Sequence, residues 1–224
     1  MAEVSFLRHA GWFGPEDAAQ LNIIGVGATG SYIGLIAAKM GFHKFQIWDK
    51  DIVETHNLPN QIYDICHIGK SKVDAFEEVL TRFNPCIEVI KHNKFFTTEE
   101  DKDLLSGPVV LTVDTMSARK DIYDSFKLNW KIKNVYETRL GFDYGELNII
   151  DTLNTNQLTE WASTLRDDSD IPDGPCNLRI CTTLVSLVAS YTVHCLCNNL
   201  SREPKPLQKK TMFSLQPNLK TYTL

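Results

Sequence analysis

The first half of the chain alternates between short apolar runs and longer stretches with helical periodicity. Residues 21–24 form an apolar run that ends at Gly25, and a helical pattern then extends from about Ser31 to Met40 and closes at Gly41. Glycine is favoured just after a helix because it readily adopts the left-handed backbone conformation. Periodicity predicts further strands at 45–48, 87–90 and 109–113, and further helices at 72–83, 98–105 and 117–128. Strands that alternate with helices predict a parallel sheet with right-handed crossovers.

The second half has a different pattern. Strand candidates at 134–138 and 145–150 are followed by a polar stretch at 154–178, for which we predict a long loop. Residues 180–200 contain no Asp, Glu, Lys or Arg over about the length that spans a bilayer. Their serines, threonines, histidine and asparagines favour a helix buried in a globular core over a membrane span. A linker rich in proline and lysine then leads to a strand-like tail at 211–224.

We therefore expect an α/β fold: a Rossmann-like parallel sheet with flanking helices and additional antiparallel strands in the C-terminal half. We assign residues 1–224 to one domain, with an N-terminal arm at 1–20, a long loop at 151–179, and a linker with C-terminal strands at 201–224. The composition, 43% hydrophobic and 23% charged, is that of a globular protein. A chain of this length can bury a core without a metal or a disulfide.

Charge and cysteine usage narrow the possible partners. The net charge of −5 argues against nucleic acid as a general partner, because such binding rests on many cationic contacts to phosphates. The negative net charge remains compatible with a local cationic pocket. The amino terminus lacks a secretion signal, so we expect the six cysteines to be reduced thiols of a cytoplasmic protein with no membrane partner. No C-x-x-C pair occurs, which argues against structural zinc.

A glycine-rich segment follows the first predicted strand and opens the first helix: Gly25-Val26-Gly27-Ala28-Thr29-Gly30. Without side chains the backbone can turn tightly and approach a phosphate, to which the helix N-terminus offers unpaired N–H groups. Asp49, at the end of the second strand, stands where an acid can bind ribose hydroxyls. Taken alone, these features also fit an NAD-dependent oxidoreductase, or a glycine turn kept for packing.

Three further segments carry a resemblance to a known family. Residues 49–61, Asp-Lys-Asp-Ile-Val-Glu-Thr-His-Asn-Leu-Pro-Asn-Gln, resemble the D-x-D-x-V-E-x-x-N-L-x-R-Q segment of the ubiquitin-activating-enzyme superfamily, which includes ThiF, MoeB and HesA. Residues 69–73, Gly-Lys-Ser-Lys-Val, resemble the G-x-x-K-V helix start of that family. Asp114 with Arg119 resembles its D-x-x-x-x-R segment, and the order and spacing hold over residues 23–119. Residues 51–61 and Lys72 would have no role in hydride transfer, which argues against an NAD-dependent dehydrogenase.

The resemblance implies an adenylyltransferase that uses ATP and Mg²⁺ to activate a carboxylate. The implied substrate is the C-terminal glycine of a small ubiquitin-like or sulfur-carrier protein, and many relatives add a thioester step. The resemblance also implies a homodimer, and a minimal adenylation domain without the catalytic-cysteine and ubiquitin-fold domains of larger relatives. A non-catalytic scaffold subunit of the same fold is the alternative.

The resemblance also implies a role for each matched residue. The glycine loop and Lys72 would hold phosphates, and the lysine would neutralise charge that develops in the transition state. Asp114 would coordinate magnesium, although aspartate is also favoured as a helix N-cap. For Asp51, the alternative to nucleotide binding is a role in stabilising the loop. The nucleotide-binding set is completed by Asp49, Asp51, Asn57 and Gln61.

Some positions depart from the family pattern. Asn60 stands where the family has arginine, which removes a cation expected near the phosphates. Arg8 is the first candidate to replace it, since an N-terminal arginine of relatives reaches the active site of a partner subunit. Arg139 is the second, with a strand-end salt bridge as its alternative role. Cys176 is the candidate thiol that accepts the acyl group, with Cys181 as the second candidate and loop packing as the other explanation for Cys176.

Overall fold

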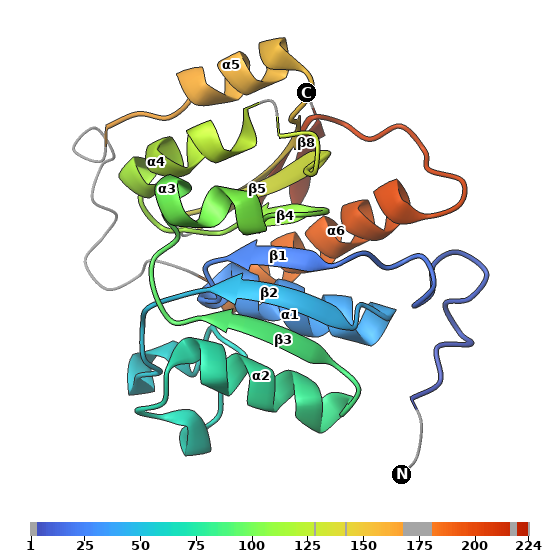
Figure 1. Cartoon of the computed structure of the whole chain (residues 1–224), viewed down its shortest axis with the longest axis vertical. Coiled ribbons are helices and arrows are strands. Elements are labelled where there is room, and N and C mark those ends of the chain that lie inside the picture. The colour runs from blue at the N-terminus through green and yellow to red at the C-terminus, as the bar shows by residue number, and fades with distance from the viewer. Residues whose placement is uncertain (1–3, 128, 142, 168–180, 216–218, 224) are drawn as a thin grey trace.

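An eight-stranded mixed sheet lies between two layers of helices (Figure 1). The computed structural model describes residues 4–127, 129–141, 143–167, 181–215 and 219–223. The strand order is β3-β2-β1-β4-β5-β6-β7-β8, in which the first five are parallel and β6, β7 and β8 are antiparallel to their neighbours. The strands span Leu21–Ile24 (β1), Lys44–Trp48 (β2), Glu88–His92 (β3), Val109–Leu111 (β4), Asn134–Leu140 (β5), Tyr144–Asp151 (β6), Lys210–Ser214 (β7) and Lys220–Thr223 (β8).

The helices divide between the two faces of the sheet. Apolar residues of α1, α2 and α6 join one buried cluster, and those of α4 and α5 join a second cluster on the opposite face. The helices span Ala28–Met40 (α1), Lys72–Phe83 (α2), Thr98–Asp101 (α3), Met116–Phe126 (α4), Thr155–Ser163 (α5) and Thr182–Leu200 (α6), with 3₁₀ turns at Thr55–Asn57 (η1), Ile65–His67 (η2) and Lys102–Leu104 (η3).

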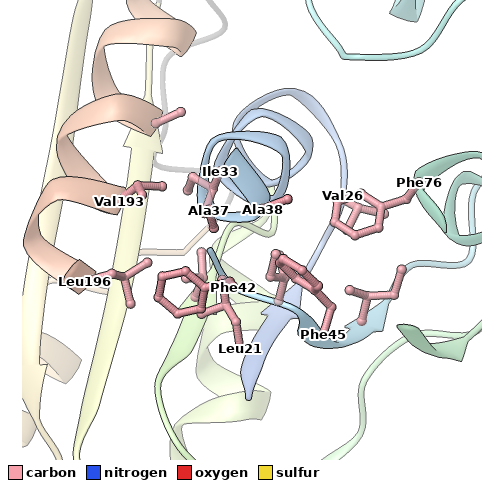
Figure 2. Close-up of a cluster of buried hydrophobic side chains, with 14 of the residues drawn as sticks. Leu21, Val26, Ile33, Ala37, Ala38, Phe42, Phe45, Phe76, Val193 and Leu196 are labelled. Carbon is pink, nitrogen blue, oxygen red and sulfur yellow. The ribbon is translucent and has the colours of Figure 1, made fainter. Parts of the chain in front are cut away.

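Side-chain alternation along the strands explains why both faces are apolar. In β1, Leu21 and Ile23 enter the cluster of α1, α2 and α6, whereas Ile24 enters the cluster on the other face. Figure 2 shows the first cluster, in which residues of β1, β2, α1, α2 and α6 converge. Gly34 of α1 lies so close to α2 that an added Cβ would be 2.3 Å from the ring of Phe76. The interface between these helices therefore requires a residue without a side chain there.

The predicted fold class is confirmed, but the long loop predicted at 151–179 is wrong in part, because it contains α5. The Asn154 side chain caps this helix and accepts the N–H of Gln157 at 3.2 Å, while Leu158 and Trp161 are buried. A helix of this length is marginal in isolation and depends on tertiary packing. The sequence did not predict α5 because two apolar residues in a polar stretch give only a weak helical periodicity. Residues 168–180 lie outside the described part of the chain.

The apolar segment predicted as a buried helix forms α6, which packs along α1 and β6. Among the described residues, no helix combines the length and the apolar character needed to cross a membrane. Cys195 and Cys197 are fully buried in α6. All five cysteines within the described ranges carry free thiols.

A crevice is expected at the carboxyl ends of β1 and β4. These strands are neighbours in the sheet, although β2 and β3 come between them in the sequence. The connections that follow β1 and β4 go to opposite faces of the sheet, as the two buried clusters show. Open α/β sheets bind ligands at such a switch point. The glycine loop follows β1, and Asp114 follows β4.

Candidate functional site

The glycine loop turns from β1 into α1 at this crevice. Gly25 has a φ of +95°, in the left-handed region that favours glycine. The Tyr63 hydroxyl donates to the carbonyl of Val26 at 2.7 Å, and the Thr112 hydroxyl donates to that of Gly25 at 2.6 Å. Helix α1 then begins at Ala28 without a side-chain cap. Its first N–H groups are therefore suited to an anion that enters the crevice.

Alanine at two glycines of this loop separates packing from ligand contact. A Cβ on Gly30 would lie 2.0 Å from the carbonyl oxygen of Gly25, whereas one on Gly27 meets nothing within 4 Å. We expect Gly30→Ala to lower the free energy of unfolding by about 1–3 kcal/mol, as overpacking does. Gly27→Ala should melt like the wild type but bind ATP more weakly, because its methyl group enters the cleft. Thermal melts with and without ATP–Mg²⁺ measure both effects. Wild-type ATP binding by Gly27→Ala would contradict phosphate placement on this loop.

Asp49 holds the loops that meet at the crevice. Its Oδ2 accepts the N–H of Val26 and its Oδ1 accepts the N–H of Asp51, each at 2.9 Å. Burial raises the pKa of the Asp49 carboxyl, against the opposing effects of Lys72 and these two N–H groups. The ionised carboxylate therefore costs stability at neutral pH. Hydroxyl donors of a ligand such as ribose would offset that cost.

Lys72 lies at the start of α2 with its ammonium directed to the cleft. Its Nζ forms an ion pair with Asp51 Oδ2 at 2.8 Å, and only 9% of the lysine side chain is exposed. Asp51 is itself 52% exposed, so it positions the lysine from the rim of the site. The neighbouring Lys70 pairs instead with Glu78 at 2.6 Å and does not line the cleft. Lys72 is thus distinguished from its neighbour by burial and direction.

Asp114 is exposed at the carboxyl end of β4 and lines the same cleft. The N-cap of α4 is Thr115, whose hydroxyl accepts the N–H of Ala118 at 3.3 Å. Asp114 is therefore not the N-cap, the alternative that the sequence left open. A carboxylate here suits Mg²⁺, which binds through one or two carboxylates together with substrate phosphates.

A buried charge network adjoins Asp114 and was missed by sequence reasoning. Glu137, with no exposed surface, accepts from Arg119 Nε at 2.8 Å and from Arg139 Nε at 2.7 Å. Asn148 Nδ2 donates to its other oxygen at 2.7 Å. Burial lowers the pKa of the Arg119 guanidinium, although Glu137 opposes that shift. The sequence signal was limited to Arg119 and Arg139, and nothing indicated the carboxylate that joins them.

The residues around the crevice enclose a cleft of about 1830 Å³. It is larger than a nucleotide requires, and it extends past β4 to Arg139, Arg166 and Lys210. Among the described residues, the buried Oδ1 of Asn60 and Oε1 of Gln61 have no protein hydrogen-bond partner. Such groups call for an explanation, and a ligand site provides one. The structure brings ten predicted site residues to the cleft: Gly25, Gly27, Ala28, Thr29, Asp49, Asp51, Asn57, Gln61, Lys72 and Asp114.

Other predicted residues lie elsewhere. Gly30 supports the loop from below, packed against the carbonyl of Gly25. Arg8 is exposed on the N-terminal arm, which lies toward the amino ends of the strands and does not line the cleft of its own chain (Figure 1). Cys176 is outside the described residues. Cys181 precedes α6, and a hydrogen bond with the Thr183 hydroxyl lowers the pKa of its thiol.

The fold is that of a Rossmann-like α/β protein, and its cleft lies at the switch point of the sheet, where open α/β sheets bind ligands. The model of the ThiF family matches residues 17–223, and the chain belongs to that family.

Comparison with curated proteins gives partial matches. The chain is 31% identical over 87 residues to ubiquitin-like modifier-activating enzyme 5 of Caenorhabditis briggsae. This match covers 39% of this chain and 20% of that protein. The matched region is thus about a fifth of the relative's length.

Two solved structures show the same fold over most of the chain. PaaA superposes with a TM-score of 0.72 at 19% identity, covering 93% of this chain and 65% of PaaA. MccB of E. coli, solved with AMPCPP and MccA, superposes with a TM-score of 0.70 at 14% identity, covering 94% of this chain and 64% of MccB. The chain spans just under two thirds of these proteins.

Proposed function

We propose that this protein is an ATP- and Mg²⁺-dependent adenylyltransferase that activates a carboxylate. The convergence of the glycine loop, Lys72 and Asp114 on one cleft carries the proposal. Each is suited to a different part of the reaction: N–H donors for phosphate, a mobile cation for developing charge, and a carboxylate for a divalent metal. Membership of the ThiF family supports the same reaction class.

The substrate we propose is the C-terminal carboxylate of a small ubiquitin-like or sulfur-carrier protein. The name of the nematode relative supports a ubiquitin-like modifier, and the solved MccB complex, with MccA and AMPCPP, supports a nucleotide with a second small partner at this fold. The part of the cleft beyond β4 offers room for such a tail beside the nucleotide.

In the proposed reaction, a carboxylate oxygen of the substrate attacks the α-phosphorus of ATP. The bond between that phosphorus and the oxygen bridging to the β-phosphate breaks, so acyl-adenylate forms and pyrophosphate leaves. Lys72, released from Asp51 toward the phosphates, would neutralise negative charge as it develops. Asp49 would hold the ribose hydroxyls, and the N–H groups at the start of α1 would hold phosphate oxygens.

The residues present fit one magnesium ion. Asp114 supplies the oxygen ligand that Mg²⁺ prefers, at the strand end where the phosphates are expected. When bound, the ion supplies Lewis-acid polarisation of phosphate oxygens. Asp114 would hold it, and Arg119 behind Asp114 is paired with Glu137 rather than with the metal ligand.

Two copies of the chain form the active unit in this proposal. Arg8 does not line the cleft of its own chain, and its exposure on the arm suits a contact with the cleft of a second copy. Such a contact would supply the cation that Asn60 does not.

Pyrophosphate exchange tests the proposal. The protein is incubated with labelled pyrophosphate, ATP, Mg²⁺ and candidate carrier proteins that end in glycine. We expect label to enter ATP only when a matching carrier with a free carboxyl terminus is present. Absence of exchange with every carrier, together with absence of ATP binding by calorimetry, would contradict the proposal.

One observation favours a second candidate, a scaffold subunit that retains the fold without catalysis. Asn60 replaces the arginine of the family segment, and its buried Oδ1 is an acceptor rather than a cation. ATP binding without exchange in any carrier reaction would support the scaffold. If the protein were an oxidoreductase, it would bind NADH tightly. Fluorescence titration measures NADH binding, and we expect none.

A further inference from the structure

From β5 onward the lining of the cleft holds more basic than acidic side chains, with Arg139, Arg166 and Lys210 against Glu146. Glu137 is a single buried carboxylate shared by two guanidiniums, those of Arg119 and Arg139. Glu146, the cross-strand neighbour of Arg139, forms its ion pair with Lys210 at 3.1 Å. Buried or half-buried charge is stable only with a partner, so this part of the cleft favours an anion.

Both arginines of the network line the cleft, and Arg139 is the more exposed of the two. The Arg139 side chain is 14% exposed and that of Arg119 is 5% exposed, and Arg119 also donates to the carbonyl oxygens of Thr115 and Thr138. Besides Glu137, Arg139 donates to Thr164 through Nη2 at 2.8 Å to Oγ1 and through Nη1 at 3.4 Å to the carbonyl oxygen. A guanidinium has five N–H groups. Within the described residues, the bonds to Glu137 and Thr164 use one N–H group on each of the three nitrogens. One N–H group on Nη1 and one on Nη2 therefore remain for a carboxylate.

The sheet places Arg139 on the side of Asp114 away from the glycine loop. Leu111, the last residue of β4, pairs with Glu137 of β5, and beyond that pair both Arg139 and Asp114 line the cleft. Adjacent strands are about 4.8 Å apart. The glycine loop and Asp49 follow β1 and β2, on the other side of β4. A nucleotide over β1 and β2 therefore leaves β5 to the second substrate.

We infer that Arg139 is the residue that binds the carboxylate to be activated, with one oxygen on a free N–H group of the guanidinium and the other directed at the α-phosphorus. This inference rests on the proposed function, because it assigns the acyl side of the same cleft. Glu137 and Thr164 are positioning residues that fix the guanidinium. The substrate class it selects is an acyl group with a free terminal carboxylate, as opposed to the corresponding amide.

A pair of peptides tests the inference. The probes are a hexapeptide that ends in Gly-Gly with a free carboxylate, and the same peptide as its C-terminal amide. Calorimetry is run with the protein saturated with AMPCPP and Mg²⁺. We expect the acid to bind about tenfold or more tightly than the amide, as a charge-assisted pair allows. Arg139→Gln should abolish that preference and leave the AMPCPP affinity unchanged, and Arg139→Lys should retain part of the preference.

The control is Arg82→Gln, which removes the same charge from an exposed arginine of α2 outside the cleft. It should bind both peptides like the wild type. Equal binding of acid and amide by the wild type, or an acid preference that survives in Arg139→Gln, would overturn the inference. A wild-type protein that fails to bind AMPCPP contradicts the proposed function instead, so the two failures are distinguishable.

Discussion

Replacing Lys72 with methionine lowers the rate of carrier-dependent pyrophosphate exchange by about 10²–10³-fold, the loss typical when one preorganised charge-stabilising group is removed. The side chain keeps its apolar length, so the 9% exposed stem still packs at the start of α2. Asp51 loses its ion-pair partner but is 52% exposed and remains hydrated, so the melting temperature should change little. Initial exchange rates and thermal melts measure the two quantities.

Lys70→Met is the matched control for this experiment. Lys70 lies two residues earlier in the same segment, but its ammonium pairs with Glu78 outside the cleft. It should exchange at the wild-type rate. Equal losses in both variants would show that general positive charge, and not the Lys72 ammonium in the cleft, supports the reaction.

Glu137→Ala destabilises the fold by about 3–5 kcal/mol, the cost of leaving buried charges without their partner. The substitution leaves the guanidiniums of Arg119 and Arg139 facing each other, and Asn148 loses its acceptor. For a chain of this size the melting temperature should fall by about 10–15 °C. Urea denaturation gives the change in the free energy of unfolding directly.

The matched control is Glu146→Gln, which removes a carboxylate on the neighbouring strand. Glu146 is 14% exposed and makes a single ion pair with Lys210, so we expect a loss of about 1 kcal/mol or less. A Glu137→Ala variant as stable as Glu146→Gln would mean that water reaches both guanidiniums. The network would then be unable to fix Arg139.

Local sequence patterns predicted those residues of the candidate site that come from contiguous segments and that line one cleft in the structure. The glycine loop, Asp49 and Lys72 each stand at a fixed distance from a strand or helix end, and parallel strands bring their carboxyl ends to one edge. The antiparallel C-terminal strands were also predicted, because 145–150 and 211–224 carry strand-like composition. Helix α5 was missed, since its stability comes from Leu158 and Trp161 packing and not from its own periodicity.

Long-range polar contacts could not be predicted in the same way. Glu137 lies 18 residues after Arg119 and is joined to Asn148 only by the antiparallel pairing of β5 with β6. A carboxylate in a strand usually predicts a solvent-facing position, whereas this one is buried because four side-chain donors surround it, those of Arg119, Arg139, Asn148 and Trp161. Sequence reasoning therefore identified Arg139 as a candidate cation but gave no reason for its fixed orientation.

Transfer of ¹⁸O from substrate to nucleotide tests carboxylate adenylation most directly. A carrier that supports exchange is labelled with ¹⁸O in its C-terminal carboxylate and incubated with the protein, ATP and Mg²⁺, and the AMP released on breakdown of the adenylate is analysed by mass spectrometry. Attack of that carboxylate on the α-phosphorus predicts AMP that contains one ¹⁸O atom. AMP without the label, formed at the same rate, would contradict carboxylate adenylation and assign the turnover to hydrolysis of ATP by water.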